Sequence, residues 1–146
     1  TFLYLWQKLL QMEHTVFCPI RRKRVALTPE ENVRQQLIRW LVGNKGYPIG
    51  LLSAEYSIKL GKKSFRCDIV AFDRSLAPLV IFECKAPSVK LDGSVMEQAI
   101  RYNMVLGARY LVITNGEVVY VCRLGVGEKG YEYVNKIPSY FEAKGE

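Results

Sequence analysis

Two acidic residues and a lysine fall on two apolar segments that could pair as a β-hairpin. Asp68 lies in the segment 66–72, and Glu83 and Lys85 lie in the segment 79–85. The short link between the segments contains a proline and small polar residues, which is typical of a turn between strands. An antiparallel pair carrying carboxylates and an amine is therefore expected, and such groups can bind a cation or act on a polar substrate.

The midpoint of this hairpin predicts which residues face each other. If the chain turns between residues 75 and 76, positions equidistant from that point are paired, and Asp68 and Glu83 are equidistant from it. Facing Cβ atoms lie about 4.5–5.5 Å apart, and like charges there destabilise the sheet unless a cation lies between them. Lys85 projects to the same side as Glu83, whereas Cys84 turns to the core side. The spacing thus predicts a surface with two carboxylates and a lysine, and a metal ion is the natural cation.

Asp68 followed by Glu83-Cys84-Lys85 resembles the Asp-Xn-Glu-X-Lys signature of the PD-(D/E)XK nuclease superfamily, although Cys67 and not proline precedes the first acid. Longer segments are similar to the N-terminal nuclease domain of type I restriction enzyme R subunits: LTPEENVRQ at 27–35, ECKAP at 83–87, QAIRYN at 98–103 and ARYLVITNG at 108–116. This resemblance spans residues 19–123. It implies a metal-dependent endonuclease-like domain that hydrolyses phosphodiester bonds, with DNA as the expected substrate.

The resemblance also implies roles for individual residues. Mg²⁺, with Mn²⁺ as a substitute, would be bound by Asp68, Glu83 and the backbone carbonyl of Cys84, because hard divalent ions prefer oxygen ligands. The ion would stabilise charge on the scissile phosphate and acidify a bound water. Lys85 would orient that water and offset negative charge on the phosphate.

Three further residues are expected to support this site. Gln98 resembles the helix glutamine that positions water or phosphate in related enzymes, and Tyr102 is its neighbour four residues along the same helix. Glu31 has two interpretations, which the sequence leaves open. It can complete a capping box with Thr28, or it can be the acid that members of this superfamily often provide from their first helix.

The elements that must position these residues follow from hydrophobic periodicity and turn signals. We expect a short helix within 1–14; a helix from 29 to about 42 that buries Val33, Leu37, Ile38 and Leu41; a strand at 54–60; the central hairpin; a helix capped by Ser94 and Glu97 that runs to about Leu106; a hairpin at 110–122 with a type I′ turn at Asn115-Gly116; and a short strand and tail at 131–146. Glu55, in the first strand, either faces solvent or supports the site.

This order predicts an α/β fold with a restriction-endonuclease-like αβββαβ core, in which helices flank a mixed central β-sheet. The expected organisation is an N-terminal apolar helical extension at 1–18, a nuclease-like domain at 19–123, and a C-terminal extension and tail at 124–146. No G-x-x-x-x-G-K-[ST] motif is present, so the motor that drives DNA translocation in full R subunits is not encoded in this sequence.

Composition agrees with a polyanionic partner. The sequence has 21 Lys and Arg against 14 Asp and Glu, a net charge of +7, and Lys62, Lys63, Arg66 and Arg101 are candidates for binding nucleic acid. A basic run at 21–24 is interpreted as a solvated face, and in a nuclease it could instead contact phosphates. The four cysteines form no C-x-x-C pair and the single histidine is isolated, which argues against zinc and favours a reduced, cytoplasmic protein. No apolar run approaches the ~20 residues of a membrane span.

Other interpretations of the acidic pair remain open. Asp68, Glu83 and Lys85 could form a structural ion-pair cluster with Arg66, because such pairs are common on sheets. The chain could also be a catalytically silent nucleic-acid-binding or interaction module that keeps the nuclease fold. Its N-terminal apolar side chains could then join a homodimer or a larger restriction-type assembly: Phe2, Leu3, Leu5, Trp6, Leu9 and Leu10.

Overall fold

The computed structural model describes residues 1–145, and the side chains of all of these except residues 10–12, so Glu146 and the side chain of Leu10 lie outside the described part. The elements run in the order α1 (Phe2–Glu13), β1 (Thr15–Cys18), β2 (Lys23–Ala26), α2 (Pro29–Asn44), the 3-10 turn Ile49–Leu51, β3 (Leu52–Leu60), β4 (Lys63–Phe72), β5 (Pro78–Cys84), α3 (Gly93–Met104), β6 (Tyr110–Thr114), β7 (Val119–Leu124), β8 (Tyr131–Val134) and α4 (Tyr140–Ala143).

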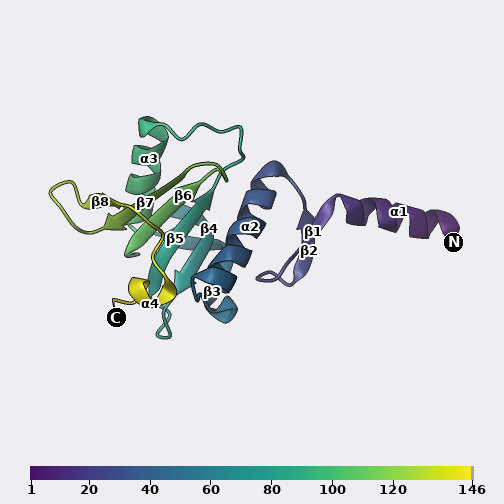
Figure 1. Ribbon diagram of the computed structural model, residues 1–146, viewed down its shortest axis with the longest axis horizontal. Coiled ribbons are helices and arrows are strands. Elements are labelled where there is room, and N and C mark those ends of the chain that lie inside the picture. The colour runs from purple at the N-terminus through teal and green to yellow at the C-terminus, as the bar shows by residue number, and fades with distance from the viewer. Residues whose placement is uncertain (146) are drawn as a thin grey trace.

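The core is a six-stranded sheet in the order β3-β4-β5-β6-β7-β8. Strands β5 and β6, which α3 connects, are parallel, and every other neighbouring pair in this sheet is antiparallel. Side chains of α2 and α4 pack in one buried cluster with one face of the sheet, and side chains of α3 pack in a second cluster with the other. The predicted mixed sheet flanked by helices is confirmed (Figure 1).

Helix α2 begins and packs as the sequence predicts. Pro29 occupies the first turn, and the N-cap Thr28 accepts a hydrogen bond of 3.1 Å from the backbone N–H of Glu31, which satisfies one of the unpaired donors at a helix start. All four side chains expected on its buried face are in the core: Val33, Leu37, Ile38 and Leu41. This helix therefore lies against one face of the sheet (Figure 1), and Arg34, near its start, lies 3.7 Å from Asp68 in the middle of β4.

The central hairpin has the predicted register. Ile69 pairs with Phe82, Val70 with Ile81 and Ala71 with Val80, and an irregularity follows Ala71. The paired ladder ends one position short of Asp68 and Glu83. The two acids thus lie where the strands begin to separate, and backbone groups there are free to bond to side chains.

The outer hairpin of β3 and β4 changes faces at Glu55 and Asp68. The ladder runs from Ala54 with Ile69 to Tyr56 with Cys67 and omits the pair between them. Residues two apart on a regular strand share a face, yet Ile69 packs in the cluster with α2 and Cys67 in the cluster with α3. Glu55 has a φ of 54°, in the left-handed region, which costs a residue other than glycine about 1–3 kcal/mol. The simple alternation predicted for this strand therefore holds only on either side of Glu55.

Three local predictions are wrong. Asp92, not Ser94, is the N-cap of α3, and its carboxylate accepts hydrogen bonds from the Val95 N–H at 3.0 Å and from the Ser94 hydroxyl at 2.8 Å. The β6–β7 connection is not a two-residue type I′ turn, because Thr114 pairs with Val119 across a four-residue loop. Asn115 Oδ1 stabilises that loop by accepting N–H groups of the two residues that precede Val119.

The third wrong prediction concerns the C-terminal segment, which the sequence predicts to end as a tail. Helix α4 instead packs in the core with its Tyr140 and Ala143 side chains buried. The Tyr140 hydroxyl donates a hydrogen bond of 3.0 Å to the carbonyl of Phe72, and the Tyr47 hydroxyl donates one of 2.7 Å to the carbonyl of Pro138. Residues 131–143 are therefore part of the folded body.

Helix α1 forms as predicted but projects away from the sheet (Figure 1). Six of its described large hydrophobic side chains are more than half exposed: Phe2, Leu3, Tyr4, Leu5, Trp6 and Leu9. In the described part of the chain, no helix is both long enough and apolar enough to span a membrane.

Candidate active site

Strand β5 and helix α3 form a pocket of about 310 Å³ that contains most of the expected site residues. Its lining consists of Arg66, Glu83, Lys85, Val95, Gln98, Ala99, Tyr102 and Asn103. Glu83 and Lys85 come from the end of β5, and Gln98 and Tyr102 come from one side of α3. Residues that are distant in the sequence are thus brought to one cavity.

The end of β5 is fixed by its backbone. Cys84 is buried in the core on the opposite side from this pocket, as predicted, and burial raises the pKa of its thiol. Its backbone N–H donates a hydrogen bond of 2.7 Å to Asp68 Oδ2. The Lys85 N–H donates one of 2.8 Å to the carbonyl of Thr114 on β6. Glu83 and Lys85 therefore project into the pocket from a strand end that is held on both sides.

Glu83 is a half-buried acid in an unfavourable setting. Burial, and then the neighbouring Asp68 carboxylate, raise the pKa of Glu83 to about 8, against the opposing charge of Lys85 and a hydrogen bond from Asn103. Its Oε1 atom has no hydrogen-bond partner among the described residues. A buried carboxylate beside another carboxylate requires a proton or a cation to be stable. The unpartnered oxygen therefore belongs to an acid that either keeps a proton or faces a cation.

The available donors fit a hard divalent ion. Asp68 and Glu83 carry carboxylate oxygens, the ligand type that Mg²⁺ and Mn²⁺ prefer. The role of the Cys84 carbonyl as a third ligand stays a prediction. No group of three or more His, Cys, Asp or Glu side chains in the described part of the chain could hold a metal ion. The side-chain ligands would then be limited to the two acids, and water or substrate would complete the coordination.

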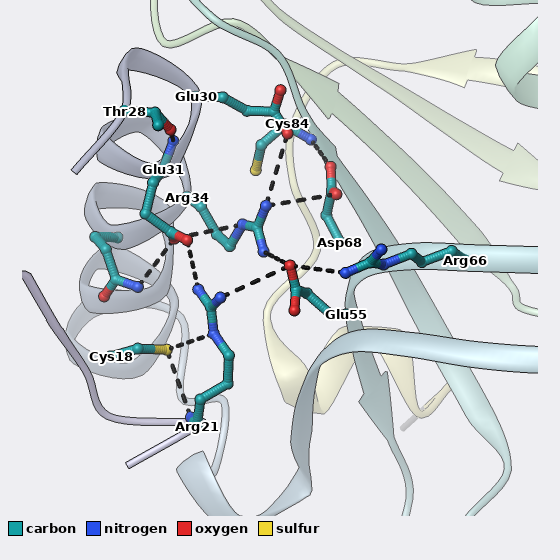
Figure 2. A network of polar contacts seen from close by, with 11 residues as sticks. Cys18, Arg21, Thr28, Glu30, Glu31, Arg34, Glu55, Arg66, Asp68 and Cys84 are labelled. Carbon is teal, nitrogen blue, oxygen red and sulfur yellow. Dashed lines mark hydrogen bonds and ion pairs between the residues drawn. The ribbon is translucent and has the colours of Figure 1, made fainter. Parts of the chain in front are cut away.

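A second polar cluster lies on the α2 side of Asp68 (Figure 2). At its centre is the guanidinium of Arg34, whose side chain is 7% exposed. Its nitrogens lie 3.5 Å from a Glu31 oxygen, 3.6 Å from one of Glu30, and 3.7 Å from oxygens of both Glu55 and Asp68. Arg34 thus connects acids of α2 with Glu55, where the β3–β4 ladder is interrupted, and with Asp68, the expected metal-binding acid.

Glu31 is held in this cluster and does not complete a capping box. Its Oε1 accepts a hydrogen bond of 2.6 Å from Arg21, and its Oε2 accepts one of 3.2 Å from Gln35. The carboxylate therefore points away from the N-cap, and only the Thr28 half of the predicted box forms. Arg21, which was expected on a solvated face, is largely buried, with 13% of its side chain exposed. The structure places Glu31 near Asp68, but with Arg34 between them.

Sequence reasoning missed both arginines. Arg34 follows Glu30 by four residues and Glu31 by three, the spacing at which helical side chains meet, so its ion pairs with them could have been found. The Arg21 contact depends on the β1–β2 hairpin, which no pattern in the sequence indicated. Asn103, buried beside Glu83 in the pocket, was also missed, although it directly follows Tyr102.

Glu55 is neither fully solvated nor part of the pocket. Burial opposes ionisation, but the charges of Arg66, Arg21 and Arg34 lower the pKa of Glu55. The nearest contact is 3.0 Å, to Arg66. The carboxylate is thus fixed among arginines at the point where the strand pair changes faces.

Tyr102 joins α3 to the edge of the site. Its hydroxyl accepts a hydrogen bond of 2.7 Å from the backbone N–H of Arg66, and its ring lies 4.7 Å, centroid to centroid, from that of Phe65. The Arg66 side chain is exposed and lines the pocket. Lys62 and Lys63 lie at the exposed β3–β4 turn, and Arg101 lies on the outer side of α3, 3.9 Å from Glu97. The nucleic-acid-binding role of these four basic residues stays a prediction.

Comparisons with known proteins agree with this architecture. No curated protein matches the chain. Among solved structures, a fragment described as an HsdR subunit of a type I restriction enzyme from Vibrio vulnificus YJ016 aligns with a TM-score of 0.56 and 19% identity. The alignment covers 81% of this chain and 25% of that one, so the chain spans about a quarter of that fragment. At this identity the likeness shows a shared fold. The family model for the type I restriction enzyme R protein N terminus (HSDR_N) matches residues 29–138, which is most of the chain, and the chain therefore belongs to this family.

Proposed function

We propose that this domain is a metal-dependent endonuclease of the PD-(D/E)XK type that hydrolyses phosphodiester bonds in DNA. The observation that carries the proposal is the buried Oε1 atom of Glu83, which has no hydrogen-bond partner among the described residues. Glu83 lies beside Asp68 and in the same pocket as Lys85 and Gln98. Family membership supports a restriction-type role, in which the domain would act in the cytoplasm within a larger assembly.

In this proposal Asp68, Glu83 and the Cys84 carbonyl would hold Mg²⁺. When bound, the ion supplies a Lewis acid that lowers the pKa of water and offsets charge on the phosphate. Asp68 is held by the Cys84 N–H, which donates to its Oδ2, and its Oδ1 lies 3.7 Å from Nη2 of Arg34. Hydrolysis forms a bond from the water oxygen to phosphorus and breaks the bond from phosphorus to one sugar oxygen. The water proton passes to solvent, and the departing oxygen takes up a proton.

Lys85 and Gln98 act on the reacting groups. Lys85, the residue after Cys84, lines the pocket. Its ammonium can therefore stabilise the charge that builds on the phosphate. Gln98 lines the same wall from α3 and can orient water or a phosphate oxygen through its amide. Tyr102 is a positioning residue, since its hydroxyl is already engaged by the Arg66 backbone.

Incubation of the purified protein with labelled plasmid, oligonucleotides and RNA, each with Mg²⁺, Mn²⁺ or EDTA, tests the proposal. Cleavage of DNA that needs a divalent ion and is lost in Glu83→Gln is the expected result. Glu97→Gln, an exposed acid on α3, is the matched control and should cleave as wild type does. Binding to DNA without cleavage under any of these conditions would favour a silent module that keeps the nuclease fold.

A further inference from the structure

Asn103 is a buried amide in the wall of the pocket, and the proposed mechanism gives it no task. It lies near the end of α3, is 1% exposed, and lines the pocket together with Glu83. A polar side chain buried this deeply is stable only when its donors and acceptors are satisfied. The contacts of its amide therefore indicate what the side chain does.

Two contacts fix the orientation of this amide. Its Nδ2 donates a hydrogen bond of 2.8 Å to the carbonyl of Ala99, one turn earlier in α3. The thiol of Cys67, on β4, donates to its Oδ1 at a sulfur-to-oxygen distance of 3.9 Å. The oxygen and the nitrogen cannot exchange places without the loss of both contacts. The NH2 end of Asn103 is therefore assigned by its partners.

The nitrogen has a second hydrogen to donate. An amide NH2 group carries two donors, and the Ala99 carbonyl accepts one of them. The Glu83 carboxylate is an acceptor in the same pocket, and a hydrogen bond from Asn103 favours its charged form. The Oε1 atom of Glu83 still has no partner among the described residues. Asn103 thus engages the acid from α3 and leaves an oxygen of it free for a ligand.

We infer that Asn103 is a positioning residue for Glu83, whose carboxylate it orients from α3 so that Oε1 stays available to the metal ion. The inference rests on the proposed function and adds a residue to its site. Asn103 would touch neither the ion nor the substrate. It would act through Glu83, as groups that bond to a metal ligand do, and loss of such a group usually costs about 10–100-fold in metal affinity.

The two amides of the pocket differ in their surroundings. Gln98 is exposed, so its amide can meet water or a phosphate. Asn103 is closed off from solvent, so its amide can serve only the protein groups around it. A purely structural task for Asn103 would need no more than the contacts with Ala99 and Cys67, and their loss would lower stability without changing the affinity for a metal. Measurements that separate stability from affinity therefore decide between the two tasks.

Calorimetric titration of Mn²⁺ into the intact chain, without substrate, makes this separation. Asn103→Leu keeps a similar side-chain volume and removes the amide, so the Kd for Mn²⁺ should rise about 10–100-fold. Ile100→Val shortens a buried side chain on the same helix and is the matched control, with a lower melting temperature and the wild-type Kd. In cleavage assays, Asn103→Leu should need about 10–100-fold more Mn²⁺ for its half-maximal rate, and saturating Mn²⁺ should restore most of that rate.

Nuclear magnetic resonance in EDTA tests the contact itself, without metal or cleavage. The two Nδ2 protons of Asn103, assigned through bonds from its backbone, should both exchange slowly with water in wild type. Glu83→Leu removes the acceptor and fills its space, so one of these protons should shift upfield and exchange faster. Two protons that are unchanged in Glu83→Leu would overturn the inference, and this measurement decides if Asn103→Leu does not fold.

The outcomes separate this inference from the proposed function. A folded Asn103→Leu protein with the wild-type Kd for Mn²⁺ overturns the inference and leaves the nuclease standing. Mn²⁺ binding that weakens in Asn103→Leu, in a protein whose wild type cuts no substrate, supports the inference and overturns the nuclease. A wild type that binds no Mn²⁺ overturns both.

Discussion

The backbone N–H of Cys84 donates a hydrogen bond of 2.7 Å to Oδ2 of Asp68. Asp68 lies one position and Cys84 two positions beyond the last paired residues, Ile69 and Phe82, so the bond closes this end of the β4–β5 ladder with a side chain. Because the Cys84 side chain is buried in the core, packing fixes where this N–H points. The orientation of Asp68 is therefore set by the residue next to Glu83, and the two acids are held as a unit.

Loss of the Asp68 charge should abolish metal-dependent stabilisation. A ligand that binds only the native state raises its stability by mass action, so Mn²⁺ should raise the melting temperature of wild type. Asp68→Asn keeps the shape and an oxygen that can accept the Cys84 N–H, but it removes the charge, and its shift with Mn²⁺ should be much smaller. Scanning fluorimetry with Mn²⁺ and with EDTA measures this, with Glu97→Gln as the control. Equal shifts for wild type and Asp68→Asn would contradict a metal site at this acid.

The raised pKa of Glu83 predicts how stability depends on pH without metal. Burial and Asp68 raise it from an ordinary value of 4.5 to about 8, so between these values the native state binds more protons than the unfolded state. The contribution of Glu83 to stability is complete below pH 4.5 and is lost as the pH rises through about 8.

Urea unfolding in EDTA between pH 5 and pH 9 checks this dependence. Wild type should lose unfolding free energy as the pH rises, and Glu83→Gln, which cannot ionise, should show a flatter profile. The same proton competes with the metal, so the affinity for Mn²⁺ should increase over this interval. A profile for Glu83→Gln as steep as that of wild type would show that another group causes the loss.

Much of the fold and part of the site could be predicted from the sequence, because they depend on local patterns. The register of the hairpin follows from its length, and the buried face of α2 follows from the spacing of Val33, Leu37, Ile38 and Leu41. Glu83 and Lys85 share a pocket because side chains two apart on a strand share a face.

The parts that could not be predicted depend on contacts between distant segments. Glu55 adopts a positive φ without being glycine, and its ion pairs with Arg21, Arg34 and Arg66 accompany that strain. The strand therefore changes faces where a regular alternation predicts none. The packing of α4 on the core likewise requires Tyr47 and Phe72, which are far away in the sequence, as hydrogen-bond partners.

Glu31 should contribute more to stability than a helix cap does. Its ion pair with Arg21, at 2.6 Å, is largely buried, with 8% of the Glu31 side chain exposed. Removing one partner of a buried pair costs about 3–5 kcal/mol because the other charge is left unpaired, whereas a lost cap costs about 1 kcal/mol. Urea unfolding should therefore show a larger loss for Glu31→Ala than for Thr28→Ala. Glu30→Ala, at a half-exposed acid, should lose about 0–1 kcal/mol of unfolding free energy. If Glu31→Ala loses no more than Glu30→Ala, the buried ion pair between Glu31 and Arg21 does not stabilise the fold.

Nucleic-acid binding should be driven mainly by phosphate contacts. The chain carries a net charge of +7, and release of counterions from DNA makes such binding weaken steeply as salt rises. Fluorescence anisotropy with a mixed-sequence duplex should show lower affinity and a smaller salt dependence for the double variant Lys62→Ala/Lys63→Ala and for Arg66→Ala. Lys136→Ala, at an exposed lysine between β8 and α4, is the control. Wild-type affinity that does not change between low and moderate salt would argue against a phosphate-binding surface here.

Lys85 should be needed for cleavage and not for binding. It lines the pocket with Glu83 but supplies no metal ligand, so its charge matters most when negative charge builds on the phosphate in the transition state. Lys85→Met keeps the length of the side chain and should lower the cleavage rate by at least about 100-fold, the size typical of losing one group that stabilises transition-state charge.

The same Lys85→Met protein should bind Mn²⁺ and duplex DNA nearly as wild type does, which distinguishes it from Asp68→Asn, expected to lose metal and cleavage together. Lys90→Met, at an exposed position in the β5–α3 loop, is the matched control and should keep both activities. Single-turnover cleavage beside Mn²⁺ titration makes the comparison for all three variants. If Lys85→Met cuts DNA at the wild-type rate, the lysine is not catalytic, and its place beside Glu83 serves only to balance charge within the pocket.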